Sequence, residues 1–412
     1  MRTLSKAIII LSLIFSVTNY VPISVLVLLL TPISVIGIFY RTDFLKFKKI
    51  ELYLLLLYIY VIGSTLIYNP SSFLEFDFYR KDGNFIISYL ILLVFIFLPL
   101  NIDIDIDIDK WLKRAFVIFS IASFVAFLIM PKEVPEEGGA TVHHFFFLSH
   151  NAAGGFYSVI GAMALGIYLH SKNKLYLFYA IMFIFFLYMT NSRGSILAIM
   201  AAFGYSLIKF KKPFLVFTIF LLIQFFIVQE TYPTWVSMGK IMSENANYTV
   251  SSAAQGIDFQ RVGTFIDRLY YLWPRAFDNF IHSPLLGLGF GSYDDLYYRY
   301  SDVIPHLLAI KEGAMVRHSE AHAHNSTFTI LAELGVVGYL LFILLFNEIN
   351  KKIIAIKKVE PGIFMALSLA FWTCIFSSAT EHRITTPSQM IPFFILFGIC
   401  YLKFFGRRNV ND

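Results

Sequence analysis

The sequence has few charged residues and very few cysteines. Only 15% of its 412 residues are charged, whereas 58% are hydrophobic and 18% are aromatic. The mean hydropathy of +0.69 is far from that of a soluble globular protein. The two cysteines, Cys374 and Cys400, both lie inside apolar segments. A disulfide-stapled scaffold is therefore excluded, and both cysteines are expected to be small core residues.

The sequence has instead a series of long apolar segments. Because these segments are continuous and not alternating, they predict membrane-spanning helices. By length and hydropathy we expect about 12 spans. The segments are 6–19, 21–40, 51–68, 84–100, 114–130, 151–169, 175–190, 194–209, 213–229, 325–346, 362–379 and 388–405. The first follows a basic start and resembles a signal peptide, but a second apolar run follows at once, so a retained helix is expected.

Lysine and arginine are concentrated in alternate connections between these segments. The positive-inside rule makes those connections cytoplasmic, and an even number of spans leaves both termini there. The net charge of +6 is explained by these lipid-facing loops, so no nucleic-acid partner is expected. The chain then divides into an N-terminal transmembrane region (1–228), a large periplasmic loop (229–323) and a C-terminal transmembrane region (324–412). These membrane regions would hold about 9 and about 3 helices.

Two polar groups open helices on the predicted outer face. Ser192 is suited to cap a helix that begins near Arg193. An arginine at the positive end of a helix favours a bound anion, although an interfacial arginine that extends its side chain to water is the alternative. His150 and Asn151 open the sixth span in the same way, where an aromatic belt with a helix cap is the simpler interpretation.

The long loop contains an amphipathic stretch that carries Arg268, Trp273 and Phe277. It ends near Pro284 and continues into a run of alternating glycines at 287–291, which permit tight turns. An interfacial helix followed by a glycine turn would also explain this pattern.

Histidines gather where the loop meets the tenth span. His318, Glu320 and His322 precede His324, and Asn325 is a good N-cap type. His324 would then lie just outside the first turn, at the water interface, where it can exchange protons. Zinc binding and a simple polar loop end are the alternatives, and no cysteine supports zinc.

Together these segments resemble the O-antigen ligase and Wzy-type polymerase superfamily of bacterial membrane glycosyltransferases. The closest part is His324-Asn325, nine residues, Gly335, two residues and Gly338, which fits the ligase signature. Ser192-Arg193-Gly194 is similar to the outer Ser-Arg element of the family, and the stretch from Trp273 to Gly289 is similar to its Trp…Pro-Leu-Leu-Gly-x-Gly segment. The family's loop arginine lies four residues before the tryptophan, whereas here Leu269 has that position and Arg268 precedes it.

The resemblance implies an all-α, GT-C-like polytopic enzyme of the bacterial inner membrane. It would move a glycan from undecaprenyl pyrophosphate to a hydroxyl acceptor on the periplasmic face, with inversion and without a metal or other cofactor. His324 is expected to be the general base, and Arg193 and Arg268 to stabilise the diphosphate leaving group. The expected substrate-binding residues are Asn325, Ser192, Arg261, Arg275, Trp273, His150, Asn151 and His322.

Three functions are compatible with this pattern. The leading hypothesis is a polymerase of O-antigen, capsule or exopolysaccharide repeat units, with membrane lipids and a chain-length regulator as further partners. A ligase that attaches the glycan to lipid A-core or to protein is the alternative within the same class. A lipid-linked glycan transporter is a different class, which internal repeats or charges at mid-membrane would favour. No clear repeat is visible, and the polar groups gather at one face.

Overall fold

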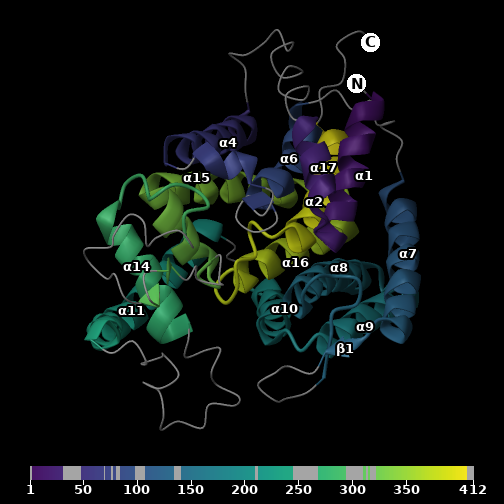
Figure 1. Cartoon of the computed structure of the whole chain (residues 1–412). Helices are drawn as coiled ribbons and strands as arrows, with labels where there is room; N and C mark the ends of the chain where they lie inside the picture. Colours follow the sequence, from purple (N-terminus) through teal and green to yellow (C-terminus); the bar gives the residue numbers. More distant parts are fainter. Residues whose placement is uncertain are drawn as a thin grey trace.

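The computed structural model describes residues 2–30, 48–68, 70–75, 78–79, 84–97, 107–133, 141–208, 212–244, 268–293, 310–311, 314–315 and 322–405. These residues are mostly helical (Figure 1). The first half contains α1 (Arg2–Thr18), α2 (Val21–Leu29), α4 (Lys49–Tyr68), η2 (Pro70–Leu74), α6 (Asn84–Phe97), α7 (Ile108–Ile129), α8 (His150–Ser171), α9 (Lys174–Met189) and α10 (Arg193–Ser206). The second half contains α11 (Pro213–Glu244), the π-helical turn η3 (Arg268–Leu272), α14 (Trp273–His282), α15 (Ser326–Ile356), α16 (Pro361–Ser377) and α17 (Pro387–Phe405). Two short antiparallel hairpins pair β1 (Lys132–Glu133) with β2 (Val142–His143) and β3 (Ile310–Lys311) with β4 (Ala314–Met315).

A helix lies in each segment that was expected to span the membrane. Among the described residues, α4, α7, α8, α11, α15 and α17 are long and apolar enough to cross a bilayer, and α1, α6, α9 and α16 are shorter apolar helices. The chain is therefore a mostly helical membrane protein, whereas the number of spans and the sidedness of the long loop stay predictions.

Two helices run further than expected. α11 continues past the predicted boundary at residue 229 to Glu244, and α15 continues past residue 346 to Ile356. The extension of α11 packs on α14, where the Tyr232 hydroxyl donates a 2.6 Å hydrogen bond to Asp278. The extension of α15 contains neither glycine nor proline, so nothing local ends the helix.

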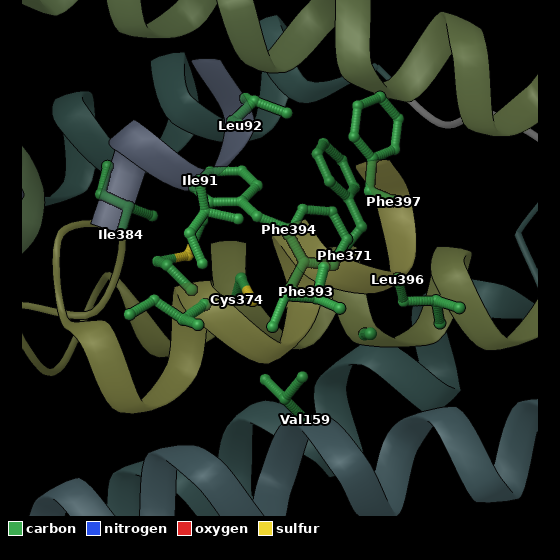
Figure 2. Close-up of a cluster of buried hydrophobic side chains, with 14 of the residues drawn as sticks. Ile91, Leu92, Val159, Phe371, Cys374, Ile384, Phe393, Phe394, Leu396 and Phe397 are labelled. Atoms are coloured by element: carbon green, nitrogen blue, oxygen red, sulfur yellow. The ribbon is translucent and has the colours of Figure 1, made fainter. Parts of the chain in front are cut away.

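The main hydrophobic core lies where α6, α8, α16 and α17 meet. Figure 2 shows Ile91, Val159, Cys374 and Phe394 from these four helices gathered in one cluster. Cys374 and Cys400 are both buried and not in a disulfide, which confirms their interpretation as core residues.

One end of the helical bundle collects basic side chains. Lys48, before α4, donates through Nζ to the carbonyl of Phe405 at the end of α17 (2.7 Å), and Lys352 of α15 lies over the Phe405 ring. Tyr176 hydrogen-bonds Asp109, which joins the start of α9 to the start of α7. The starts of α8, α10, α15 and α17 consequently lie at the other end. This grouping follows the pattern of basic connections expected from the positive-inside rule.

The helix α15 is broken at Gly335, and the glycine turn of the long loop fills the break. Gly335 has φ 62° and ψ −165°, a conformation that is essentially restricted to glycine. Across the break, the N–H of Val336 donates to the carbonyl of Pro284 (2.9 Å). A Cβ atom at Gly335 would lie 2.4 Å from the carbonyl oxygen of Leu285. The two glycine-containing motifs therefore dock on each other, which explains why both need glycine.

Candidate active site

Asn325 joins the start of α15 to the connection between α16 and α17. Its side-chain oxygen accepts from the N–H of Phe328 (3.1 Å), as predicted for an N-cap, and its Nδ2 donates to the carbonyl of Ala379 (3.1 Å). His324 precedes the cap with φ 47°, an uncommon left-handed conformation for a residue other than glycine. The position of His324 just outside the first turn is confirmed.

His324 forms a short hydrogen-bond contact with a residue that the sequence did not single out. Its Nδ1 lies 2.8 Å from Oε2 of Glu381, and Arg268 donates to the other carboxylate oxygen of Glu381 (2.8 Å) and to the carbonyl of Thr380 (2.7 Å). Burial by itself would raise the pKa of Glu381. The hydrogen bond with His324 and the charges of Arg383 and Arg268 outweigh burial and hold that pKa well below the usual glutamate range. Glu381 is therefore ionised.

Two further imidazoles extend the cluster. The His322 ring lies 4.7 Å from the His324 ring and stacks on His382, also at 4.7 Å. Burial, reinforced by the neighbouring His324 and Arg383, lowers the pKa of His382 to about 3. Burial likewise lowers the pKa of His322 well below its ordinary value, with His382 and His324 adding to the effect. Both rings are therefore neutral near pH 7. The part of the chain that the structure describes contains no set of three His, Cys, Asp or Glu side chains arranged to hold a metal.

The start of α10 approaches this cluster directly. Ser192 occupies the N-cap position of α10, but its hydroxyl makes no capping bond, contrary to expectation; it lies 3.3 Å from Oδ1 of Asn151 and 3.0 Å from Oγ of Ser195. These contacts hold the side chain away from the helix N–H groups. A Cβ atom at Gly194 would lie 2.6 Å from the Thr380 hydroxyl, so α10 and the α16–α17 connection touch.

Two arginines near this contact differ in exposure. Arg193 opens α10 with an exposed side chain, and within the described ranges no ion pair involves it. Arg383 is buried, with one guanidinium nitrogen 3.5 Å from the Ser195 hydroxyl and its backbone N–H donating to the Ser326 hydroxyl (2.9 Å). Burial lowers the pKa of Arg383, while Glu381 opposes that shift. Of these two arginines, Arg193 is therefore the one that a ligand can contact, whereas Arg383 is buried inside the protein.

Two expected substrate-binding residues are packed inside the protein. Trp273 is buried with its ring 5.6 Å from that of Phe328, and Arg275 is buried with a 2.6 Å hydrogen bond to the carbonyl of Tyr293. Their burial fits residues that fix α14 against its neighbours, and a side chain in this position does not present a face to a sugar.

The other predicted residues are near the site or beyond the described ranges. Asn151 reaches the cluster through Ser192, and His150 lies beside it, with its ring 5.7 Å from that of His144. Arg261, His318 and Glu320 lie outside the described residues.

Sequence reasoning missed Glu381, His382 and Arg383. All three lie in the short connection between the last two apolar segments, on the same predicted face as His324. Three consecutive ionisable residues in so short a membrane connection are a usable signal. Their pairing with His324 was not visible, because Glu381 lies 57 residues further along the chain.

The sequence was also compared with known protein families and with curated proteins. Residues 177–343 match the family model described as O-antigen ligase. The matched range runs from α9 into α15 and includes Arg193, Arg268 and His324, while Glu381 lies beyond it. A comparison with curated proteins found no match. The match to the O-antigen ligase family model supports the resemblance to the O-antigen ligase and polymerase superfamily that the motifs predicted.

Proposed function

We propose that the protein transfers a glycan from an undecaprenyl-pyrophosphate carrier to a hydroxyl group of an acceptor, with His324 as the general base. The observation that carries this proposal is the 2.8 Å contact between His324 Nδ1 and Glu381. An ionised carboxylate can only accept a hydrogen bond, so Nδ1 carries the proton and Nε2 is the basic nitrogen. Glu381 thus orients the imidazole for proton abstraction and stabilises the imidazolium that forms.

The transfer then needs one displacement. The acceptor oxygen attacks the anomeric carbon while its proton passes to Nε2 of His324, and the bond from that carbon to the diphosphate oxygen breaks. A single displacement inverts the anomeric centre. Undecaprenyl pyrophosphate leaves with the electron pair of the broken bond, so negative charge develops on the diphosphate.

Several positive groups surround the place where this charge develops. Arg193 is exposed at the start of α10, and its planar guanidinium suits two diphosphate oxygens. The starts of α8, α10 and α15 converge there through the contacts of Asn151, Ser192 and Asn325, and helix N-termini favour anions. Arg268 has a different part, because its two bonds to Thr380 and Glu381 hold the carboxylate in place. In this proposal the arginines supply the positive charge of the site.

The distribution of basic residues indicates on which side of the membrane the site lies. The basic helix ends lie opposite the histidine cluster, and basic connections favour the cytoplasmic side. We therefore propose an inner-membrane enzyme with cytoplasmic termini and a periplasmic site, where the lipid-linked glycan would be presented.

Polymerisation of repeat units is our leading form of the reaction, in which the acceptor is a second lipid-linked glycan. Ligation to lipid A-core or to a protein is the second form, and the description of the matched family as O-antigen ligase favours it. Both use the same donor and the same base, so the acceptor alone distinguishes them.

The decisive experiment reconstitutes the purified full-length protein in liposomes with a lipid-linked repeat unit. Release of undecaprenyl pyrophosphate and glycan length on a gel are measured, with and without lipid A-core. A ladder without added acceptor supports a polymerase, and transfer only after addition of lipid A-core supports a ligase. His324→Ala should abolish either product, whereas the matched control His170→Ala, exposed at the far end of α8, should not. Movement of glycan across the bilayer without release of the carrier would instead indicate a transporter and contradict the proposal.

A further inference from the structure

An apolar cavity lies between α1, α7, α8 and α17, away from the histidine cluster. Its volume is about 360 Å³, and its wall includes Leu13, Trp111, Ala115, Met163 and Leu396. Among the described residues that line it, Arg114 is the one that carries a charge. This volume is near the lower end of the roughly 300–1,000 Å³ typical of small-molecule sites, which leaves room for one slender apolar group.

The α7 wall of the cavity lies near the start of that helix, at the basic end of the bundle. Met163 is 12 residues beyond Asn151 along α8, which corresponds to about 18 Å at 1.5 Å per residue. The charged rim of the cavity is further still from Asn151. It lies at the start of α7, where Asp109 accepts a hydrogen bond from Tyr176 at the start of α9. A head group held at Arg114 is therefore distinct from a diphosphate held at Arg193.

The cavity opens toward the lipid-facing surface of α7. Ile118 lines the cavity and is nevertheless 64% exposed. Further along the same helix Ile121, Phe124 and Leu128 are also exposed, and Figure 1 shows α7 at one edge of the molecule. In a membrane protein such an apolar surface faces acyl chains, so a chain can enter the cavity from the side.

Charge at the rim of the cavity is positive. Lys110 and Arg114 are both exposed and are four residues apart, so they share one face of α7. Of the acidic groups described at this end of α7, Asp109 pairs with Lys113 (2.6 Å), and Asp107 accepts from the backbone N–H of Lys110 (3.0 Å).

We propose that this cavity binds one acyl chain of an anionic phospholipid, whose phosphate lies at Arg114 and Lys110. The apolar wall fits a hydrocarbon chain, and basic residues beside a gap between membrane helices recognise anionic head groups. The acyl chain of the lipid would fill the space that separates α7 from α1 and α17. Trp111, half-exposed beside Arg114, is of the type that anchors at the level of lipid head groups.

Native mass spectrometry of the purified full-length protein tests this inference. The protein is exchanged into equal amounts of phosphatidylglycerol and phosphatidylcholine with identical chains. With about 1 kcal/mol for each of two basic residues, we expect retained phosphatidylglycerol to exceed phosphatidylcholine about 30-fold. The double variant Lys110→Gln, Arg114→Gln should bring this ratio close to one. Lys174→Gln, an exposed charge at the same end of the bundle, is the matched control and should leave the ratio unchanged.

A second variant tests the binding of the acyl chain separately from the binding of the head group. Ala115→Phe places a ring in the cavity and should reduce retention of both lipids at least tenfold, whereas Val125→Phe on the exposed face of α7 should not. Equal retention of the two lipids by the wild type would overturn the proposal. So would displacement of phosphatidylglycerol by undecaprenyl phosphate, because the cavity would then belong to the carrier. If Ala115→Phe aggregates, the double variant Lys110→Gln, Arg114→Gln becomes the deciding test of the proposal, because it changes only surface residues.

Discussion

Nδ1 of His324 lies 2.8 Å from Oε2 of Glu381, which joins the start of α15 to the connection between α16 and α17. The same carboxylate binds Arg268 through its other oxygen, so both oxygens are engaged. Burial of this bridge, with the side chain of Glu381 only 8% exposed, keeps water from competing for its bonds. His324, Glu381 and Arg268 therefore form one hydrogen-bonded unit. The effects of substituting any two of them are expected not to be additive.

Replacement of Glu381 should affect proton transfer more than binding. His324→Ala removes the base and should lower kcat by about 10²–10⁴-fold. Glu381→Gln removes the charge that favours the imidazolium, so kcat should fall by an intermediate factor and the acid limb of the pH profile should move to lower pH. Donor-concentration series measured from pH 5 to 9 check this. An unchanged pH profile in active Glu381→Gln protein would contradict the role of Glu381.

Lysine should replace arginine at one position and not at the other. Arg193 is exposed, so Arg193→Lys keeps a positive charge for the diphosphate and should retain much more activity than Arg193→Ala. Arg268 bonds two acceptors in a fixed geometry, at 2.7 and 2.8 Å, which a single ammonium cannot reproduce. Arg268→Lys should therefore be nearly as inactive as Arg268→Ala. Steady-state rates at matched protein levels test the difference, and equal rescue at both positions would contradict it.

Acid should destabilise the protein through its buried histidines. The unfolded chain protonates histidine near pH 6.5, at roughly the ordinary value, whereas the folded protein keeps His382 neutral down to about pH 3. Between these values the unfolded state binds more protons, so the free energy of unfolding falls as the pH falls. The depressed pKa of Glu381 acts in the same direction, but only below about pH 4.3, the usual glutamate value.

The melting temperature in detergent between pH 7.5 and 4.5 measures this effect. His382→Phe removes the proton uptake and keeps an aromatic ring against His322, so its melting temperature should depend less on pH than that of the wild type. His170→Phe, at an exposed position, is the control and should follow the wild type. Parallel curves for wild type and His382→Phe would exclude His382 as a source of acid sensitivity.

Two glycine substitutions should have opposite outcomes. Gly335→Ala forces alanine into a conformation that costs about 1–3 kcal/mol, and its Cβ would lie 2.4 Å from a backbone oxygen. Loss of folded protein is expected. Gly204→Ala, inside α10 with no atom within 4 Å of its Cβ position, should be neutral or stabilising by about 0.5–1 kcal/mol. Fluorescence-detected size exclusion compares the two, and a monodisperse, stable Gly335→Ala protein would show that the break in α15 is dispensable.

The sequence by itself determined the local features of this protein. Apolar length and continuity specified its membrane helices, Asn325 specified the start of α15, and the spacing of His324 and Gly335 indicated the family. Each of these depends on interactions within a few residues of the chain, such as an N-cap bond or a backbone conformation that only glycine tolerates.

Only the tertiary structure decided which distant residues meet. It selected Arg268 instead of the buried Arg275 for the cluster, and it joined His324 to Glu381 and Arg268 to Thr380 across 57 and 112 residues. It also buried Trp273, which the family resemblance had suggested as a substrate contact. These pairings depend on how whole helices pack and which of their ends coincide. Hydropathy reports whether a segment enters the membrane, but it carries no information about the segment that will lie beside it.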